Sequence, residues 1–138
     1  FLKKNKIIFI NDSKATSFDA SKYALGKNNN ILWIVGGQPK LGDKFKLKNL
    51  KKNIIKAYVI GKHTNFFTNQ LAKKIKYKIS YNLRKAIIDI LQDLTNLKTH
   101  KLTILLSPAS ASYDQFKNFV DRGNQFKKLI NIYAKKFI

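Results

Sequence analysis

Four short apolar runs and a weaker fifth one set the main pattern of hydrophobic and polar positions along the chain. The apolar runs are rich in Ile, Val, Leu and aromatic residues, and they lie at 6–10, 31–35, 54–60 and 102–106. Such runs predict strands, and a run with apolar residues on both faces is typical of a strand buried inside a parallel sheet. The weaker run at 76–80 predicts a short strand at an edge of the sheet.

Between these runs, apolar residues recur at the spacing of an amphipathic helix. The spacing is clearest from Leu83 to Leu94 and predicts a helix that ends near Asn96. Two further helices are expected to begin at caps: one at Thr16, with Asp19 as its capping partner, and one at Ser112, with Gln115 as its capping-box partner. Two more helices are expected over 65–75 and 124–137, and a loop with a short helix over 41–52.

Strands that alternate with helices predict right-handed crossovers and an α/β fold. We expect a three-layer sandwich in which helices cover both faces of a mostly parallel, Rossmann-like sheet of about five to six strands. The 138 residues, 44% of them hydrophobic, are long and apolar enough to bury one core. The sequence therefore predicts a single domain without internal repeats.

Three polar or glycine-rich segments follow three of the predicted strands. They are NDSKAT at 11–16, GGQPK at 36–40 and SPASAS at 107–112. Ligands of open α/β sheets bind at the carboxyl ends of the strands, and a helix N-terminus there favours an anion. The same segments also fit ordinary turns, because Asn, Asp, Ser and Gly favour turns by themselves. The pattern thus marks one edge of the sheet as a candidate site, with simple loops as the alternative.

Charge adds a second candidate function. The chain carries 28 Lys and Arg against 7 Asp and Glu, a formal net charge of +21, and a strongly basic domain can bind nucleic acid. However, only Arg84 and Arg122 are arginines, and the lysines are scattered among many Asn, Ile, Phe and Tyr residues. This mixture is what an AT-rich genome would impose on a solvated protein surface, so no specific nucleic-acid partner is expected. A basic nucleic-acid-binding α/β domain stays an alternative.

Several residue types and segments are missing from the sequence. There is no Cys, which agrees with a cytoplasmic protein, and no apolar run approaches the length of a membrane span or a signal peptide. We therefore expect no membrane partner. There is also no Met, so we expect the sequence to be a fragment or a cut domain.

The segment at 107–126, SPASASYDQFKNFVDRGNQF, resembles the C-terminal signature of bacterial Mur ligases that add D-glutamate to UDP-N-acetylmuramoyl-L-alanine, the MurD family. The family reads roughly SPACAS-x-D-x-FKNF-x-x-RG-x-x-F there, so the chain departs at Ser110, usually cysteine, and at Val120, usually acidic. NDSKAT is a second hallmark, although Ser17 replaces the asparagine that usually follows it. Lys40 matches the lysine of a third, GG-x-x-K.

This resemblance implies that residues 1–138 are the C-terminal, D-glutamate-binding domain of a bacterial, cytoplasmic, peptidoglycan-precursor ligase. Such ligases use ATP to form an acyl phosphate, which the amine of D-glutamate then attacks. The resemblance places ATP and Mg²⁺ mainly on a central domain, and UDP-N-acetylmuramoyl-L-alanine on further domains, that the chain does not include. No Walker loop occurs in it. We expect a monomer that is inactive as an isolated fragment, with a stand-alone amino-acid-binding module as the alternative.

The resemblance also implies how D-glutamate is bound. Its two carboxylates need cations and hydrogen-bond donors. Lys40 is expected to supply the charge, while Thr16 and Ser112 supply hydroxyl donors. The backbone amide of Tyr113, expected at a helix N-terminus, would add a donor, and Phe119 would lie beside the amino acid.

Two further residues match positions near the nucleotide in the family. Asp12 is expected to accept hydrogen bonds from ribose hydroxyls, and Lys14 to act as a cation. No metal site is expected in this chain, because the metal ligands of the family lie in the central domain. His63 and His100 have no match in the family and no clustered partners, so we expect both at the surface.

Overall fold

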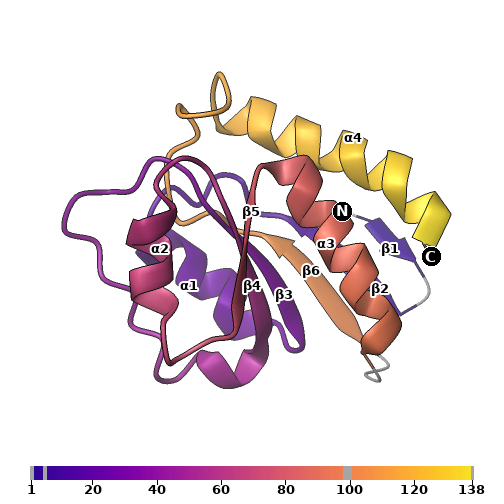
Figure 1. Ribbon diagram of the computed structural model, residues 1–138, viewed down its shortest axis with the longest axis horizontal. Coiled ribbons are helices and arrows are strands. Elements are labelled where there is room, and N and C mark those ends of the chain that lie inside the picture. The colour runs from indigo at the N-terminus through magenta and orange to yellow at the C-terminus, as the bar shows by residue number, and fades with distance from the viewer. Residues whose placement is uncertain (1, 5, 98–100, 138) are drawn as a thin grey trace.

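The computed structural model describes residues 2–4, 6–97 and 101–137. Its elements follow the predicted alternation of strands and helices (Figure 1). The strands are β1 (Leu2–Lys4), β2 (Ile7–Asn11), β3 (Ile31–Gly36), β4 (Ile54–Ile60), β5 (Tyr77–Tyr81) and β6 (Leu102–Leu106). The helices are α1 (Phe18–Lys27), α2 (Thr64–Leu71), α3 (Leu83–Asp93) and α4 (Phe119–Phe137), with short 3-10 turns at Lys51–Asn53 and Leu94–Asn96.

The six strands form one sheet in the order β1-β2-β6-β3-β4-β5. Strands β2, β6, β3, β4 and β5 are parallel to their neighbours, and only β1 runs antiparallel, beside β2. This confirms a mostly parallel, Rossmann-like sheet and places β5 at an edge, as expected. Strand β1 was not predicted, because a three-residue strand with two lysines carries no apolar run.

Helices cover both faces of the sheet, which confirms the three-layer sandwich (Figure 1). The fully buried strand β3 shows why: Trp33 and Val35 face one core with residues of α1 and α2, while Leu32 and Ile34 face a second core with residues of α3 and α4. Two-sided burial of a parallel strand explains its continuous apolar run.

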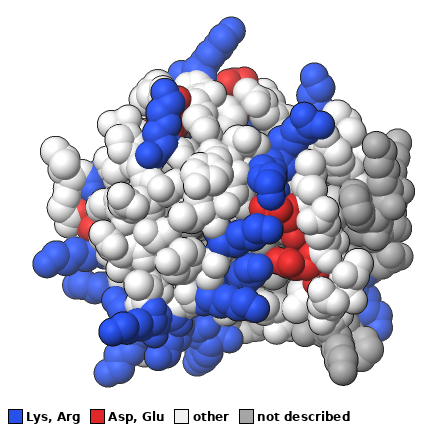
Figure 2. Space-filling view, in the orientation of Figure 1, with Lys and Arg blue, Asp and Glu red and all other residues white. Residues whose placement is uncertain are grey.

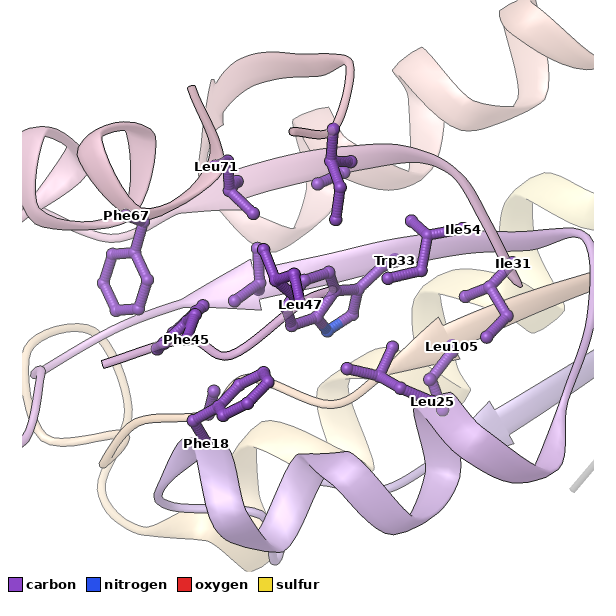
Figure 3. Close-up of a cluster of buried hydrophobic side chains, with 14 of the residues drawn as sticks. Phe18, Leu25, Ile31, Trp33, Phe45, Leu47, Ile54, Phe67, Leu71 and Leu105 are labelled. Carbon is purple, nitrogen blue, oxygen red and sulfur yellow. The ribbon is translucent and has the colours of Figure 1, made fainter. Parts of the chain in front are cut away.

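The segment between β3 and β4 closes the first core. Phe45 and Leu47 are buried there, and Figure 3 shows the ring of Phe45 between those of Phe18 and Phe67. The rings of Phe18 and Phe45 stack with centroids 4.6 Å apart. Such aromatic pairs add to the stability that burial alone provides. The expected loop with a short helix is thus a loop anchored by two apolar residues, followed by the 3-10 turn.

The expected helix start at Ser112 is wrong. Residues 112–118 form turns and bends, and a single helix, α4, covers the remainder of the described chain. The Ser112 carbonyl accepts from the amides of Gln115 and Phe116, but the Gln115 side chain donates to the carbonyl of Tyr81. The capping box therefore does not form, because a partner on β5 takes the glutamine amide.

The cap of α4 lies six residues later. The Asn118 side chain accepts from the amide of Asp121, and the Asp121 carboxylate accepts from the amide of Lys117. At α1 the cap is Ser17, whose hydroxyl accepts from the amide of Ala20, and the exposed Thr16 precedes it. Both corrections shift a helix start without changing the order of the elements.

Candidate functional site

Three loops meet at the carboxyl ends of β2, β3 and β6; we call residues 11–16, 36–40 and 107–112 the three site loops. Strand β6 lies between β2 and β3, so its end brings the loops together. The backbone bonds them directly: the amide of Asp12 donates to the carbonyl of Leu106 over 2.7 Å, and the amide of Gly36 to that of Pro108 over 3.0 Å. The three marked segments therefore share one edge.

A second set of bonds joins the tips of the loops. Gln38 and Ala111 form an antiparallel bridge with amide–carbonyl distances of 2.8 and 2.9 Å. The amide of Ser110 donates to the carbonyl of Ala15 over 3.3 Å. The loop that carries Lys40 is thus paired with the loop that carries Ser112, and the latter also touches the loop that ends in Thr16.

Ser107 connects the site to the core. Its hydroxyl donates to the Oδ2 atom of Asp12 over 2.7 Å, and its carbonyl accepts from the indole Nε1 of Trp33, also over 2.7 Å. Burial raises the pKa of Asp12, and the hydrogen bond from Ser107 partly opposes this rise. The Asp12 carboxylate is therefore held in one orientation at the edge of the sheet.

Two glycines allow the loops to approach so closely. Gly36 and Gly37 have φ angles of 129° and 145°, which residues with a Cβ atom rarely adopt. A Cβ at Gly37 would lie 2.5 Å from the carbonyl oxygen of Ala111 and 2.8 Å from the Ser110 hydroxyl. The glycine pair is thus a requirement of this junction, although two glycines after a strand are weak evidence in a sequence.

The residues expected to bind D-glutamate differ in exposure. Ser112 is buried, whereas Thr16 and Lys40 are exposed and Tyr113 is 73% exposed. Because α4 begins only at Phe119, the amide of Tyr113 belongs to a turn and not to a helix N-terminus. The expected helix N-terminus at Tyr113 is therefore wrong, and its amide has no helix dipole behind it.

Phe119 lies on the β2 side of the three site loops. It is 39% exposed and, with Lys14, lines a hollow of about 220 Å³, to which Asn11 and Ser13 also contribute. The structure thus brings one residue expected near D-glutamate together with one expected near the nucleotide. Asp12 and Ser112 are not among the residues that line this hollow.

Arg122 is a residue that the sequence analysis did not assign. Its side chain is fully buried, and it donates from Nε to the hydroxyl and from Nη2 to the carbonyl of Ser13, over 3.0 and 2.8 Å. One signal was available in the sequence. Arg122 is one of only two arginines among 28 basic residues, and it falls on the arginine of the RG pair in the signature at 107–126.

Neither a metal site nor a membrane helix is found in the part of the chain that the structure describes. No group of three His, Cys, Asp or Glu side chains could hold a metal ion within residues 2–4, 6–97 and 101–137. None of the helices there has the length and apolarity to cross a bilayer. His63 is exposed, as expected, whereas His100 lies outside the described residues.

Basic side chains do not gather over the site loops alone. Figure 2 shows Lys and Arg side chains in several places on the face in view, densest at its lower left, with acidic side chains among basic ones at the centre right. Among the ion pairs of the described residues, Asp89 pairs with Lys78 and Lys85, and Asp93 pairs with Lys56. On the face in view, basic side chains therefore do not form one continuous patch.

Comparison with known proteins identifies the relatives of the chain, although no family model matches it. It is 40% identical over 128 residues to a UDP-N-acetylmuramoylalanine–D-glutamate ligase of Nitrobacter hamburgensis, a match that covers 93% of the chain and 28% of the relative. An enzyme of the same name from Bartonella henselae is 41% identical over 124 residues, which cover 90% of the chain and 27% of the relative. The chain thus spans little more than a quarter of these relatives. With about 40% identity along nine-tenths of its length, the chain belongs to the UDP-N-acetylmuramoylalanine–D-glutamate ligase family.

Proposed function

We propose that residues 1–138 are the C-terminal domain of a ligase that joins D-glutamate to UDP-N-acetylmuramoyl-L-alanine, and that this domain binds D-glutamate and helps to enclose ATP. The junction of the three site loops carries the proposal. Three motifs that lie far apart in the sequence are hydrogen-bonded to one another at the carboxyl edge of a parallel sheet. This edge is where ligands bind in open α/β sheets.

The chemistry of the loops suits an amino acid with two carboxylates. The ammonium group of Lys40 supplies a positive charge on an exposed loop, and the hydroxyls of Thr16 and Ser112 supply donors from the two neighbouring loops. The amide of Tyr113 adds a donor next to Ser112. The ring of Phe119 offers an apolar wall for the methylene groups of the amino acid.

The nucleotide lies on the β2 side in this proposal. Asp12, held by Ser107, is an acceptor for ribose hydroxyls, and Lys14 places a cation beside phosphate groups. In the reaction, ATP transfers its γ-phosphoryl group to the carboxylate of the UDP-linked substrate, releasing ADP. The amine of D-glutamate attacks the acyl phosphate, an amide bond forms, and phosphate leaves. Mg²⁺ and most contacts to ATP belong to other domains, and the ligase is a cytoplasmic monomer.

Phosphate release by the full-length ligase tests this function. Release should require ATP, UDP-N-acetylmuramoyl-L-alanine and D-glutamate together, and L-glutamate should not replace the D-isomer. The isolated 138 residues should fold but release no phosphate with the same substrates, because they contain no Walker loop. Equal rates with L-glutamate, or ligation by the isolated chain, would contradict this assignment of roles.

A further inference from the structure

Arg122 is the largest buried charge of the described chain and needs an explanation beyond packing. Its side chain is 0% exposed in the first turns of α4. Burial lowers the pKa of Arg122 to about 10, and the charge of Asp114 opposes this shift. Taking a guanidinium out of water is unfavourable unless it is hydrogen-bonded. The buried guanidinium is therefore expected to form hydrogen bonds that fix a neighbouring segment of the chain.

The guanidinium group holds Ser13 at two points. Its Nε atom donates to the Ser13 hydroxyl over 3.0 Å, and Nη2 donates to the Ser13 carbonyl over 2.8 Å. The Ser13 hydroxyl donates in turn to the carbonyl of Phe119 over 2.6 Å. A chain of hydrogen bonds thus runs from Arg122 through Ser13 to Phe119 and joins α4 to the loop at 11–16.

This chain of hydrogen bonds joins two parts of the proposed site. Ser13 stands between Asp12 and Lys14, which are assigned to the nucleotide, and Phe119 is assigned to D-glutamate. The next residue, Gly123, allows the close approach: a Cβ there would lie 2.7 Å from the Nδ2 atom of Asn11. The arginine and the glycine together fix the start of α4 against the loop at 11–16.

The third nitrogen of the guanidinium faces the glycine loop. A Cβ on Gly37 would lie 3.4 Å from Nη1. Neither Nη1 nor the Oδ1 atom of Asp114 has a hydrogen-bond partner among the described residues, although both are buried. The Oδ2 atom of Asp114 accepts from the amide of Lys62, in the loop after β4. The guanidinium thus lies at the junction of the loops and near one balancing carboxylate.

We propose that Arg122 is a positioning residue that couples the nucleotide side of the site to its D-glutamate side through Ser13 and Phe119. The coupling rests on the proposed function. It requires the planar fork of a guanidinium, because one group must donate to a hydroxyl and to a carbonyl of the same residue. A lysine would keep the charge but could not make both contacts in that geometry.

Steady-state kinetics of the full-length ligase test this coupling. Arg122→Lys should raise the KM values for ATP and for D-glutamate together, each by roughly tenfold or more, since it loses the paired, charge-assisted hydrogen bonds that hold Ser13 and, through the Ser13 hydroxyl, Phe119. Arg84→Lys is the matched control, because Arg84 is exposed, donates to the Tyr133 hydroxyl and touches none of the three site loops. It should leave both KM values unchanged.

Two further variants separate positioning from stability. Ser13→Ala removes the shared hydroxyl without touching the charge and should raise the same two KM values. Combined with Arg122→Lys it should add little, because both changes break the same chain of hydrogen bonds. If Arg122→Ala folds, millimolar guanidinium should restore part of its activity, and the same concentration of sodium chloride should not.

The outcome that overturns the coupling is distinct from failure of the proposed function. Arg122→Lys enzyme that melts as the wild type does and keeps both KM values within about twofold would show that Arg122 only supports the fold. A change in the KM for one substrate alone would likewise contradict coupling. Absence of D-glutamate ligation by the wild-type enzyme would instead contradict the proposed function.

Discussion

The Asp12 carboxylate lies partly buried at the end of β2 and accepts a hydrogen bond from Ser107. Burial raises its pKa above the ordinary value of 3.8, so the folded chain binds a proton more readily than the unfolded chain. The contribution of Asp12 to folding stability therefore declines as the pH rises from below the unfolded pKa through the raised folded pKa. At neutral pH the charged carboxylate opposes folding.

We predict that Asp12→Asn raises the melting temperature at pH 7 while weakening use of ATP. The amide keeps an oxygen that can accept from Ser107, but it removes the buried charge. Thermal unfolding and the KM for ATP would measure the two effects. Asp19→Asn is the control, since Asp19 is exposed and pairs only with Lys22 at the surface, and should change neither quantity appreciably. A less stable Asp12→Asn protein would contradict the assigned cause of the pKa shift.

Gly37 shows how one residue fixes the junction of whole elements. Alanine at this position, with its φ of 145°, would place Cβ 2.5 Å from the carbonyl oxygen of Ala111. Either the bridge between Gln38 and Ala111 would break, or the loop after β6 would have to move away. We predict that Gly37→Ala destabilises the chain by about 1–3 kcal/mol and weakens D-glutamate use.

Gly26→Ala provides the matched control for this change. Gly26 lies inside α1, and its added Cβ would meet only the Leu50 side chain at an ordinary 3.7 Å. Alanine should stabilise the helix there by about 0.5–1 kcal/mol. Denaturant unfolding of both variants makes the comparison. Equal stability of the two variants would show that the loop junction does not require glycine.

The carboxylate of Asp93 joins helix α3 to strand β4. Asp93 accepts from Lys56 Nζ over 2.8 Å and from the Tyr58 hydroxyl over 2.7 Å, both on β4. Burial raises the pKa of Asp93, but these hydrogen bonds and the charge of Lys56 outweigh it, and the net pKa is lowered. The stabilisation is therefore present above the unfolded pKa and is lost as the pH falls through the lowered folded pKa.

We predict that Asp93→Asn lowers the free energy of unfolding at pH 7 and that its difference from wild type vanishes in strong acid. The reason is that both proteins then carry an uncharged side chain at this position. Urea unfolding at pH 7, 5 and 3 would follow the difference. A difference that stays constant over this range would mean that the ion pair with Lys56 contributes nothing to stability.

At the scale of elements, the sequence predicts strands better than helix starts. Strands β4 and β6 agree with the expected 54–60 and 102–106, because a buried parallel strand needs a continuous apolar run that turn residues end. The start of α4 could not be predicted, since the capping pattern of Ser112 is local and the Tyr81 carbonyl competes for Gln115. Arg122 was not predicted to hold Ser13, because partners 109 positions apart in sequence leave no local pattern.

At the scale of the whole molecule, the formal net charge of +21 has two competing explanations, drift in amino-acid composition and binding of nucleic acid. We predict only weak, sequence-independent binding of duplex DNA that is lost at moderate salt, because the lysines are scattered along the chain and some of them pair with acidic groups. Fluorescence anisotropy with two unrelated duplexes, titrated with salt, would measure this. A tight, sequence-selective complex at physiological salt would favour the nucleic-acid-binding alternative.

The central claim is that the edge joined by the three site loops binds D-glutamate, and Lys40 tests it most directly. The measurement is steady-state kinetics of the full-length ligase with each substrate varied in turn, for Lys40→Ala and for Lys48→Ala, an exposed lysine outside the three site loops. Loss of a charge-assisted contact is worth about 1.5–3 kcal/mol, so Lys40→Ala should reduce kcat/KM for D-glutamate by roughly ten- to a hundredfold or more. Lys48→Ala should leave it unchanged, and neither variant should alter the KM for the UDP-linked substrate. Unchanged kinetics with D-glutamate in Lys40→Ala would contradict the account.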